Sequence, residues 1–214
     1  MKVIIFGATG MVGQGALRES LLAADVEQVL SVGRRPTGVR HPKLREVTLA
    51  DFADLTPIED ELRGYDACFY CLGVSSVGLD EAAYTKVSYD YPVAAAHMLA
   101  RLNPGMTFIY VSGAGTKPDG RQMWARVKAR TEIEVIKTFP NGYGFRPGFI
   151  QPTHGATSKT GIYRVTYALT APLIPVLFKI APKYVTSTDR LGRAMLRAAR
   201  TGFATRIVEN ADLR

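Results

Sequence analysis

The chain has 214 residues, of which 47% are hydrophobic and 21% charged, and its formal net charge is +8. This composition excludes a disordered chain and fits one α/β domain with a substantial core. The basic residues are scattered and no nucleic-acid motif is present, so we expect no nucleic acid as partner; a cleft for an anionic cofactor explains the charge as well.

Two cysteines and an N-terminus that leads directly into a strand favour a cytoplasmic protein. No apolar run reaches the length of a membrane-spanning helix.

Strands and helices alternate along most of the chain. Apolar runs predict strands at residues 3–6, 28–32, 44–47, 65–72, 107–111, 142–145 and 204–209. Helical spacing predicts helices at residues 11–24, 57–63, 80–102, 122–138 and 189–200. This order predicts an α/β fold, a Rossmann-like, doubly wound parallel sheet in three layers. We expect a single NAD(P)-binding domain over residues 1–214, with residues 150–214 forming a small C-terminal lobe on the substrate side.

Glycines with GxxGxxG spacing lie between the first strand and the first helix. Gly7 permits a tight turn, Gly10 lets backbone approach a pyrophosphate, and Gly13 lets the helix pack close to the strand. Free N–H groups at the helix start then favour phosphate. Because the motif follows a strand and precedes a helix, we interpret it as a dinucleotide site rather than a turn that needs small residues. The expected cofactor contacts here are Gly7, Thr9, Gly10, Met11, Val12 and Gly13.

The residues after the second strand favour NADP(H) over NAD(H). A site for the non-phosphorylated cofactor usually offers a carboxylate at this position. This chain has Arg34 and Arg35 there, and guanidinium groups pair with a 2′-phosphate. Asp51 could accept from the adenine amino group beside Phe52, although a polar residue that starts a turn explains Asp51 almost as well.

These residues together resemble the short-chain dehydrogenase/reductase superfamily, in its extended and atypical branches with NAD(P)-binding epimerase-like proteins. The chain looks most like the atypical group that contains the Tat-interacting, tumour-suppressor-like oxidoreductase. The resemblance covers nearly the whole chain. It rests on Gly7-Ala8-Thr9-Gly10, Gly13, Val32-Gly33-Arg34-Arg35, Asp51-Phe52, Cys71-Leu72-Gly73, Val111-Ser112-Gly113, Val127-Lys128 and Phe145-Arg146-Pro147-Gly148.

The resemblance implies a Tyr-x-x-x-Lys pair on the helix after the fifth strand. The tyrosine would be the acid and base, and the lysine would hold the nicotinamide ribose and lower the tyrosine pKa. Lys128 fits the lysine, but Trp124 stands at the tyrosine position. An indole N–H only donates and cannot shuttle a proton at neutral pH. Ser112 would be the serine of the site.

The resemblance also implies cofactor contacts in two further segments. Cys71, Leu72 and Gly73 would form the wall near the pyrophosphate and the nicotinamide ribose. Backbone at Arg146 and Pro147 would flank the nicotinamide, with Arg146 anchoring the site, although an exposed arginine before a turn is equally compatible with the sequence.

The missing phenol leaves three readings open. Another acid could serve, such as Tyr84, Tyr163 or His154. Quinone-like substrates or cysteine oxidation would need little acid catalysis. The protein could also bind NADP(H) without reduction, with Trp124 as an apolar filler of the helix.

The remaining candidates favour structural roles. Cys68 and Cys71 have CxxC spacing but lie in a predicted strand, where residues three apart point to opposite faces, so we expect no redox pair. The three histidines are well separated, and we expect no metal site. Residues 162–180 are apolar with prolines and could cover the substrate pocket or form a dimer contact.

The function favoured by these features is an NADP(H)-dependent oxidoreductase of the atypical short-chain type, acting on an unknown small molecule. The alternative is a non-catalytic NADP(H)-binding regulatory or interaction protein. Epimerase or dehydratase chemistry on a sugar nucleotide is less favoured, because the C-terminal lobe is short for such a substrate. A homodimer is compatible with the sequence.

Overall fold

The computed structural model describes residues 1–157 and 182–213. At its centre is a seven-stranded sheet in the order β3-β2-β1-β4-β5-β6-β9, and every neighbouring pair is parallel. The strands are β1 (Lys2–Phe6), β2 (Gln28–Gly33), β3 (Leu44–Thr48), β4 (Ala67–Tyr70), β5 (Thr107–Val111), β6 (Asn141–Arg146) and β9 (Ile207–Glu209). The predicted doubly wound parallel sheet is therefore confirmed.

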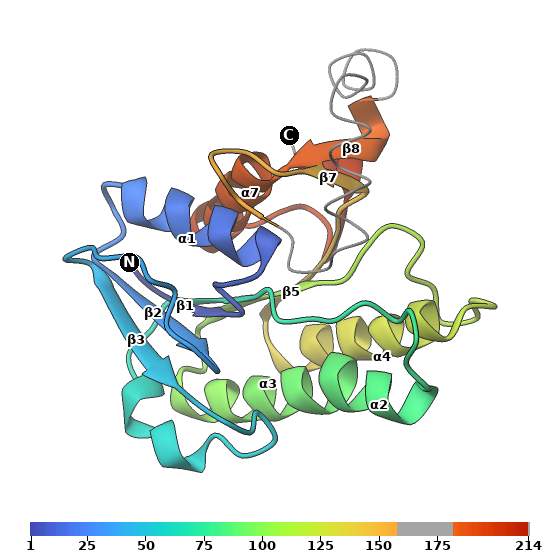
Figure 1. Cartoon of the computed structure of the whole chain (residues 1–214), viewed down its shortest axis with the longest axis horizontal. Coiled ribbons are helices and arrows are strands. Elements are labelled where there is room, and N and C mark those ends of the chain that lie inside the picture. The colour runs from blue at the N-terminus through green and yellow to red at the C-terminus, as the bar shows by residue number, and fades with distance from the viewer. Residues whose placement is uncertain (158–181, 214) are drawn as a thin grey trace.

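Helices cover both faces of this sheet (Figure 1). One face carries α1 (Met11–Leu22) and α7 (Thr188–Thr201), and the other carries α2 (Glu81–Thr85), α3 (Tyr91–Leu102) and α4 (Met123–Thr138). Since successive strand residues point to opposite faces, each strand contributes to two cores.

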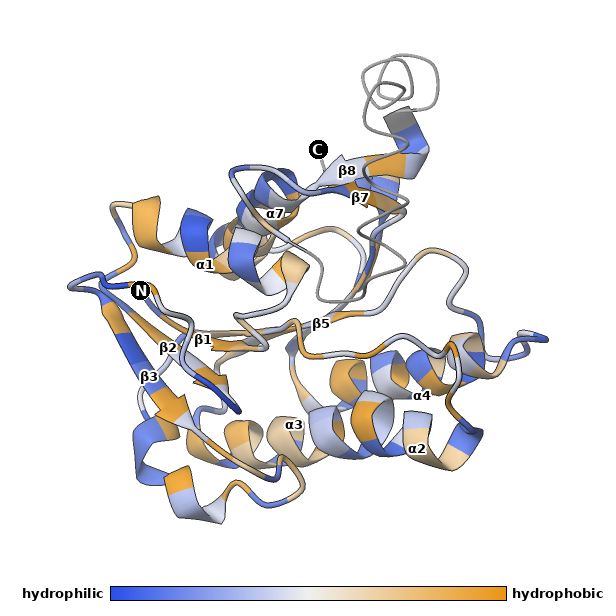
Figure 2. Cartoon of the chain, viewed as in Figure 1, coloured by the Kyte–Doolittle hydropathy of each residue, from blue (hydrophilic) through white to orange (hydrophobic). Residues whose placement is uncertain are grey.

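Strand β1 shows this division into two cores. Val3 and Ile5 belong to the core under α1 and α7, whereas Ile4 and Phe6 belong to the core on the α3 side, and all four are fully buried. Figure 2 shows the apolar strands between the two helix layers.

The predicted helix over residues 80–102 differs in detail, because a π-helical turn, Lys86–Asp90, separates α2 from α3. A π turn leaves a backbone carbonyl free of its usual helical partner. The Ser88 carbonyl accepts from the Tyr110 hydroxyl at 3.0 Å and from the Thr131 hydroxyl at 2.6 Å. These partners come from β5 and α4, so helical periodicity alone could not show the turn.

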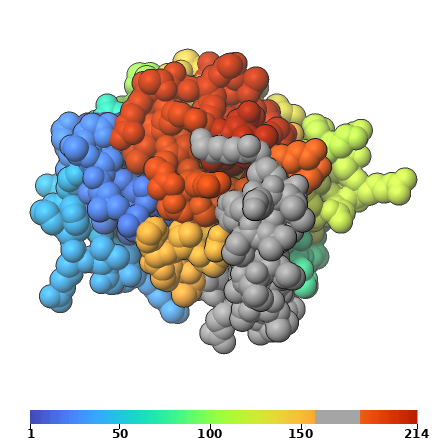
Figure 3. All heavy atoms as spheres, turned by 90° about the horizontal axis from the view of Figure 1, so that it is seen from above, coloured from blue at the N-terminus to red at the C-terminus, as the bar shows by residue number. Residues whose placement is uncertain are grey.

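Helices α1 and α7 pack unusually close together. A Cβ on Gly15 would lie 2.4 Å from the backbone oxygen of Thr188, and a Cβ on Gly192 would lie 2.9 Å from the backbone oxygen of Gly15. Figure 3 shows the C-terminal residues, in orange and red, directly beside the N-terminal residues, in blue. The contact joins the two ends of the described chain on one face of the sheet.

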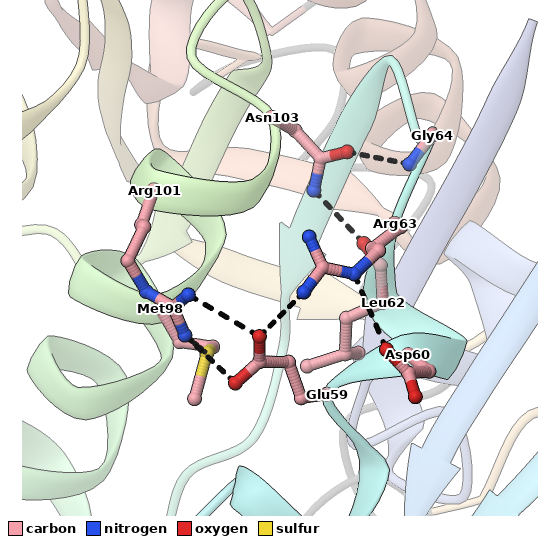
Figure 4. A network of polar contacts seen from close by, with 8 residues as sticks. All are labelled: Glu59, Asp60, Leu62, Arg63, Gly64, Met98, Arg101 and Asn103. Atoms are coloured by element: carbon pink, nitrogen blue, oxygen red, sulfur yellow. Dashed lines mark hydrogen bonds and ion pairs between the residues drawn. The ribbon is translucent and has the colours of Figure 1, made fainter.

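A polar cluster fixes the segment that leads into β4 (Figure 4). Glu59 accepts from Arg63 at 2.6 Å and from Arg101 at 2.8 Å. The Asn103 amide oxygen accepts from the Gly64 N–H at 2.7 Å, and its amide nitrogen donates to the Leu62 carbonyl at 2.8 Å. The predicted helix at residues 57–63 is here two 3₁₀ turns, Thr56–Ile58 and Asp60–Leu62. The cluster ties this segment to the end of α3 and so helps to place β4.

A second, two-stranded sheet pairs β7 (Phe149–Gln151) with β8 (Val185–Ser187) in parallel. A 3₁₀ turn, Pro182–Tyr184, precedes β8, and another, Asn210–Asp212, follows β9. The apolar stretch at residues 162–180, with Tyr163, lies outside the described residues, so the small lobe over residues 150–214 stays a prediction. No helix within residues 1–157 and 182–213 has the length and apolar character needed to cross a bilayer.

Candidate dinucleotide site

A cavity of about 480 Å³ opens at the carboxyl ends of the central strands. It collects segments that follow β1, β2, β4, β5 and β6, together with one residue of α4. The predicted site residues that line it are Gly7, Thr9, Gly10, Met11, Val12, Arg34, Cys71, Leu72, Gly73, Ser112, Lys128 and Pro147. The strand order reverses between β1 and β4, which is where ligands bind in sheets of this kind.

The glycine motif has the geometry of a phosphate cradle. Gly7 has φ +79°, and a Cβ there would lie 2.7 Å from the backbone of Leu72. A Cβ on Gly13 would lie 2.1 Å from the Gly7 carbonyl oxygen, so strand and helix touch at this residue. Gly10, the N-cap of α1, has space by comparison, because within 4 Å its Cβ would meet only the Gly7 oxygen, at 3.3 Å.

The start of α1 is suited to an anion. Among the residues that the structure describes, no side chain caps this helix end, and the first turn of the helix carries no acidic residue. The N–H groups and the positive end of the helix dipole are therefore available to a pyrophosphate. A dinucleotide fits these residues, since Gly10 leaves room where a side chain would fill the cradle.

The two arginines after β2 are placed differently from each other. Both are exposed, and Arg34 lines the cavity whereas Arg35 lies beyond its described lining. Arg34 is thus a cation at the β2 end of the site.

Asp51 and Phe52 do not join the cavity wall formed by the described residues. The Asp51 carboxylate accepts from the Ala53 N–H at 3.0 Å, which is a turn contact. Phe52 is buried in the core, where its ring lies 6.2 Å from that of Phe6 and 5.9 Å from that of Tyr91. Their role in adenine binding stays a prediction.

The two cysteines lie in different surroundings. Cys68 is fully buried in the core on the α3 side, and Cys71 is half-buried against the opposite core and lines the cavity. Burial raises the pKa of the Cys68 thiol well above its usual value and that of Cys71 to about 12. Both thiols are therefore protonated at neutral pH and are poor nucleophiles.

Ser112 is held by a buried carboxylate that sequence analysis did not identify. Its hydroxyl donates to Glu132 of α4 and lies 3.0 Å from the Phe145 carbonyl oxygen. Only 2% of Glu132 is exposed. The one sequence signal for this residue is its spacing, because Glu132 lies four positions after Lys128 and hence on the same helical face.

Arg146 neutralises this carboxylate. Its guanidinium donates to Glu132 at 2.6 and 3.0 Å and to Glu209 at 3.0 Å. The hydrogen bond to Glu132 raises the pKa of Arg146. The Arg146 side chain therefore links α4, β6 and β9, while its neighbour Pro147 lines the cavity.

Lys128 extends from α4 to the cavity wall. Its ammonium donates to the Ser112 backbone carbonyl. Burial lowers the pKa of Lys128 to about 8, and the negative charge of Glu132 opposes this shift. A cation with a pKa this close to neutrality can exchange a proton under ordinary conditions.

Trp124 and the alternative acids Tyr84 and His154 lie outside the described lining of this cavity. Trp124 is half-buried outside the described cavity lining, and a Cβ on Gly115 would lie 3.4 Å from its indole ring. Tyr84 is buried in α2. His154 lines a separate cavity of about 630 Å³ between α1 and residues 153–157. Within the described residues, no group of three or more His, Cys, Asp or Glu could hold a metal ion.

Comparisons with known proteins agree with this geometry. The model of the NAD dependent epimerase/dehydratase family matches residues 3–138. Protein FMP52, mitochondrial, of Meyerozyma guilliermondii is 22% identical over 201 residues, which make up 92% of this chain and 84% of that relative.

Solved structures with the same fold include enzymes bound to NAD. DesIV, a dTDP-glucose 4,6-dehydratase from Streptomyces venezuelae with NAD and DAU bound, matches with a TM-score of 0.73 at 16% identity, over 97% of this chain and 74% of that chain. WbmF from Bordetella bronchiseptica, in complex with NAD+, matches with a TM-score of 0.71 at 16% identity, over 99% and 76%. A short chain dehydrogenase family protein from Francisella tularensis matches with a TM-score of 0.67 at 13% identity, over 97% and 95%.

Proposed function

Because the chain belongs to the NAD dependent epimerase/dehydratase family, we propose that it is an NADP(H)-binding oxidoreductase that acts on a small molecule. The observation that supports this most is one cavity that gathers the glycine loop, Arg34 and Lys128 from three distant parts of the chain. These groups match the charges of a phosphorylated dinucleotide.

Each group has a role in this proposal. The N–H groups at the start of α1 hold the pyrophosphate. Arg34 pairs with the 2′-phosphate, and Arg35, the next residue in the chain, contributes less. Lys128 holds the nicotinamide ribose. When bound, the dinucleotide supplies or accepts a hydride at the nicotinamide ring. The segment after β4 and the backbone at Pro147 enclose the nucleotide and exclude water.

A titration with NADPH and NADH tests the cofactor assignment. We expect NADPH to bind more tightly, and Arg34→Ala to remove most of that preference, by about tenfold or more, since a charge-assisted pair contributes about 1.5–3 kcal/mol. Arg35→Ala should lower the preference less. Calorimetry measures both nucleotides, and quenching of Trp124, the single tryptophan of the chain, gives a second signal.

The two readouts separate the possible failures. Equal affinity for both nucleotides would contradict the NADP(H) preference alone. If calorimetry shows no binding of either nucleotide, the proposed function fails altogether. Binding without quenching would instead place Trp124 far from the nicotinamide.

The second candidate is a regulatory or interaction protein that binds NADP(H) without turnover. Trp124 at the expected tyrosine position and a Ser112 hydroxyl already bonded within the protein support it. NADPH binding with no consumption across panels of aldehydes, enones and quinones would favour this candidate.

Sugar-nucleotide chemistry is a third, weaker candidate. DesIV is a dTDP-glucose 4,6-dehydratase, but this chain spans 74% of its length. Turnover of dTDP-glucose or UDP-glucose would support this candidate.

We further propose a cytoplasmic location and a homodimer. The name of the fungal relative places that protein in mitochondria, so fractionation of cells that express a tagged chain would test the location. Analytical ultracentrifugation would test the dimer.

A further inference from the structure

The geometry points to Lys128 as the proton donor of this site, with its ammonium group replacing the phenol that the short-chain enzymes use. The inference rests on the proposed function and deepens it. It concerns reduction of a carbonyl, where the new hydroxyl needs a proton that the dinucleotide does not supply.

The Ser112 hydroxyl is not free for this task. Its proton is shared between Glu132 and the Phe145 carbonyl oxygen, both of which lie inside the protein. Arg146 donates hydrogen bonds to both oxygens of Glu132. An ionised carboxylate only accepts hydrogen bonds. Glu132 therefore holds the Ser112 hydroxyl in a hydrogen bond and has no proton of its own to supply.

Lys128 has protons to give. An ammonium has three N–H bonds, and within residues 1–157 and 182–213 the structure shows one hydrogen bond from Lys128, to the Ser112 carbonyl. No ion-pair partner lies within 4 Å of its nitrogen among the described residues. Lys128 also lines the cavity wall beside Ser112 and Pro147.

The charges around Lys128 balance one another. Glu132 on its own helix faces Arg146 of β6, which also binds Glu209 of β9. Tyr110 of β5 and Cys71, which follows β4, are neutral, because burial raises the pKa of both. Burial is therefore the main influence on Lys128, and it lowers the pKa to about 8. At neutral pH most of the group is protonated, yet the proton is much easier to release than that of a free lysine.

The dinucleotide, when bound, would supply a hydride, with two electrons, to the carbonyl carbon of the substrate. The carbonyl π electrons form an O–H bond with a proton from Lys128 Nζ, and the N–H bond electrons remain on the nitrogen. Lys128 is left as a neutral amine and regains a proton from water.

Lys128→Arg separates proton donation from charge. Arginine keeps the positive charge and the donors that hold a ribose, but it does not release a proton in proteins. We expect this variant to bind NADPH and to lose about 100-fold or more in kcat for an aromatic aldehyde, the usual contribution of general acid catalysis. A quinone serves as the matched substrate, since its reduced oxygen is a weakly basic phenolate. The variant should lose much less kcat for the quinone than for the aldehyde, so the ratio of the two losses isolates the proton donation.

The dependence of kcat on pH shows whether Lys128 acts in its protonated form. Reduction of the aldehyde by the wild type needs the ammonium, so kcat should fall as the pH rises through about 8. Reduction of the quinone should change little over this range.

Nuclear magnetic resonance of ¹³C-lysine-labelled protein supplies a readout without turnover. The signal that Lys128→Arg removes should titrate near pH 8, both without nucleotide and with NADP+.

Titration near 10.4, or an aldehyde rate that Lys128→Arg leaves unchanged, would overturn the inference. Absence of NADPH binding or of any consumption would overturn the proposed function with it. Should Lys128→Arg fail to fold, Lys128→Gln, which is uncharged and more compact, replaces it in the same comparison.

Discussion

Gly10 and Gly13 belong to one motif but differ in what surrounds them, and this difference provides a matched test. Gly10→Ala places a methyl group 3.3 Å from the Gly7 backbone oxygen, a tight contact that a shift of a few tenths of an ångström relieves. We expect a loss of at most about 1 kcal/mol in the free energy of unfolding, the usual cost at an N-cap, but a loss of NADPH binding of about 100-fold or more. Calorimetry and urea denaturation measure the two effects.

Gly13→Ala should act through the fold instead. Its methyl group would lie 2.1 Å from the Gly7 carbonyl oxygen, and backbone cannot move aside cheaply. We expect a loss of about 3 kcal/mol or more in the free energy of unfolding. If Gly10→Ala bound NADPH as well as the wild type, the motif would be a structural turn only.

Some residues of the site could be predicted from the sequence and others could not. The cradle glycines, Arg34 and Lys128 follow from spacing and position, and the structure places them around one cavity. Glu132 could not be found this way, because its importance depends on Arg146 and Ser112, which reach it only through the folded sheet. For the same reason the sequence could not indicate that the Ser112 proton is already bonded.

At the scale of elements, the close packing of α1 on α7 predicts a large effect from a small substitution. Gly15→Ala would place a methyl group 2.4 Å from the Thr188 backbone oxygen, so the helices must separate. We expect a loss of about 2–3 kcal/mol in the free energy of unfolding. Gly105→Ala is the control, because Gly105 is exposed with no atom within 4 Å of the added methyl group. It should change the free energy of unfolding by less than about 1 kcal/mol. Equal effects of the two substitutions on the free energy of unfolding would contradict the close packing of α1 on α7.

The elements themselves were largely predictable. Mostly apolar runs marked β1, β2, β4 and β5, because these strands are buried on both faces of the sheet. The π turn was not predictable, since it depends on hydroxyl groups of Tyr110 and Thr131 that lie on other elements. The exact length of β9 was also not predictable, because its three residues are defined by pairing with β6.

At the scale of the whole molecule, the topology predicts one cooperative unfolding transition. Strand β9 pairs with β6 and α7 packs on α1, so residues 185–213 complete the sheet and the core that the N-terminal residues begin. Calorimetric and van't Hoff enthalpies should therefore agree. NADPH at 100 times its Kd should add about 2.7 kcal/mol to the free energy of unfolding, without splitting the transition. Two separate transitions would instead support an independent C-terminal lobe.

The reversal of strand order between β1 and β4 has a consequence for the lifetime of the protein. A ligand in the crevice at this reversal touches loops from both halves of the sheet, so neither half can open to a protease while the ligand is bound. On the proposed assignment, resistance to digestion would then follow the supply of NADP(H). A cell that depletes its total pool of this dinucleotide would degrade the protein faster, and the abundance of the protein would report the size of that pool even where no substrate is present.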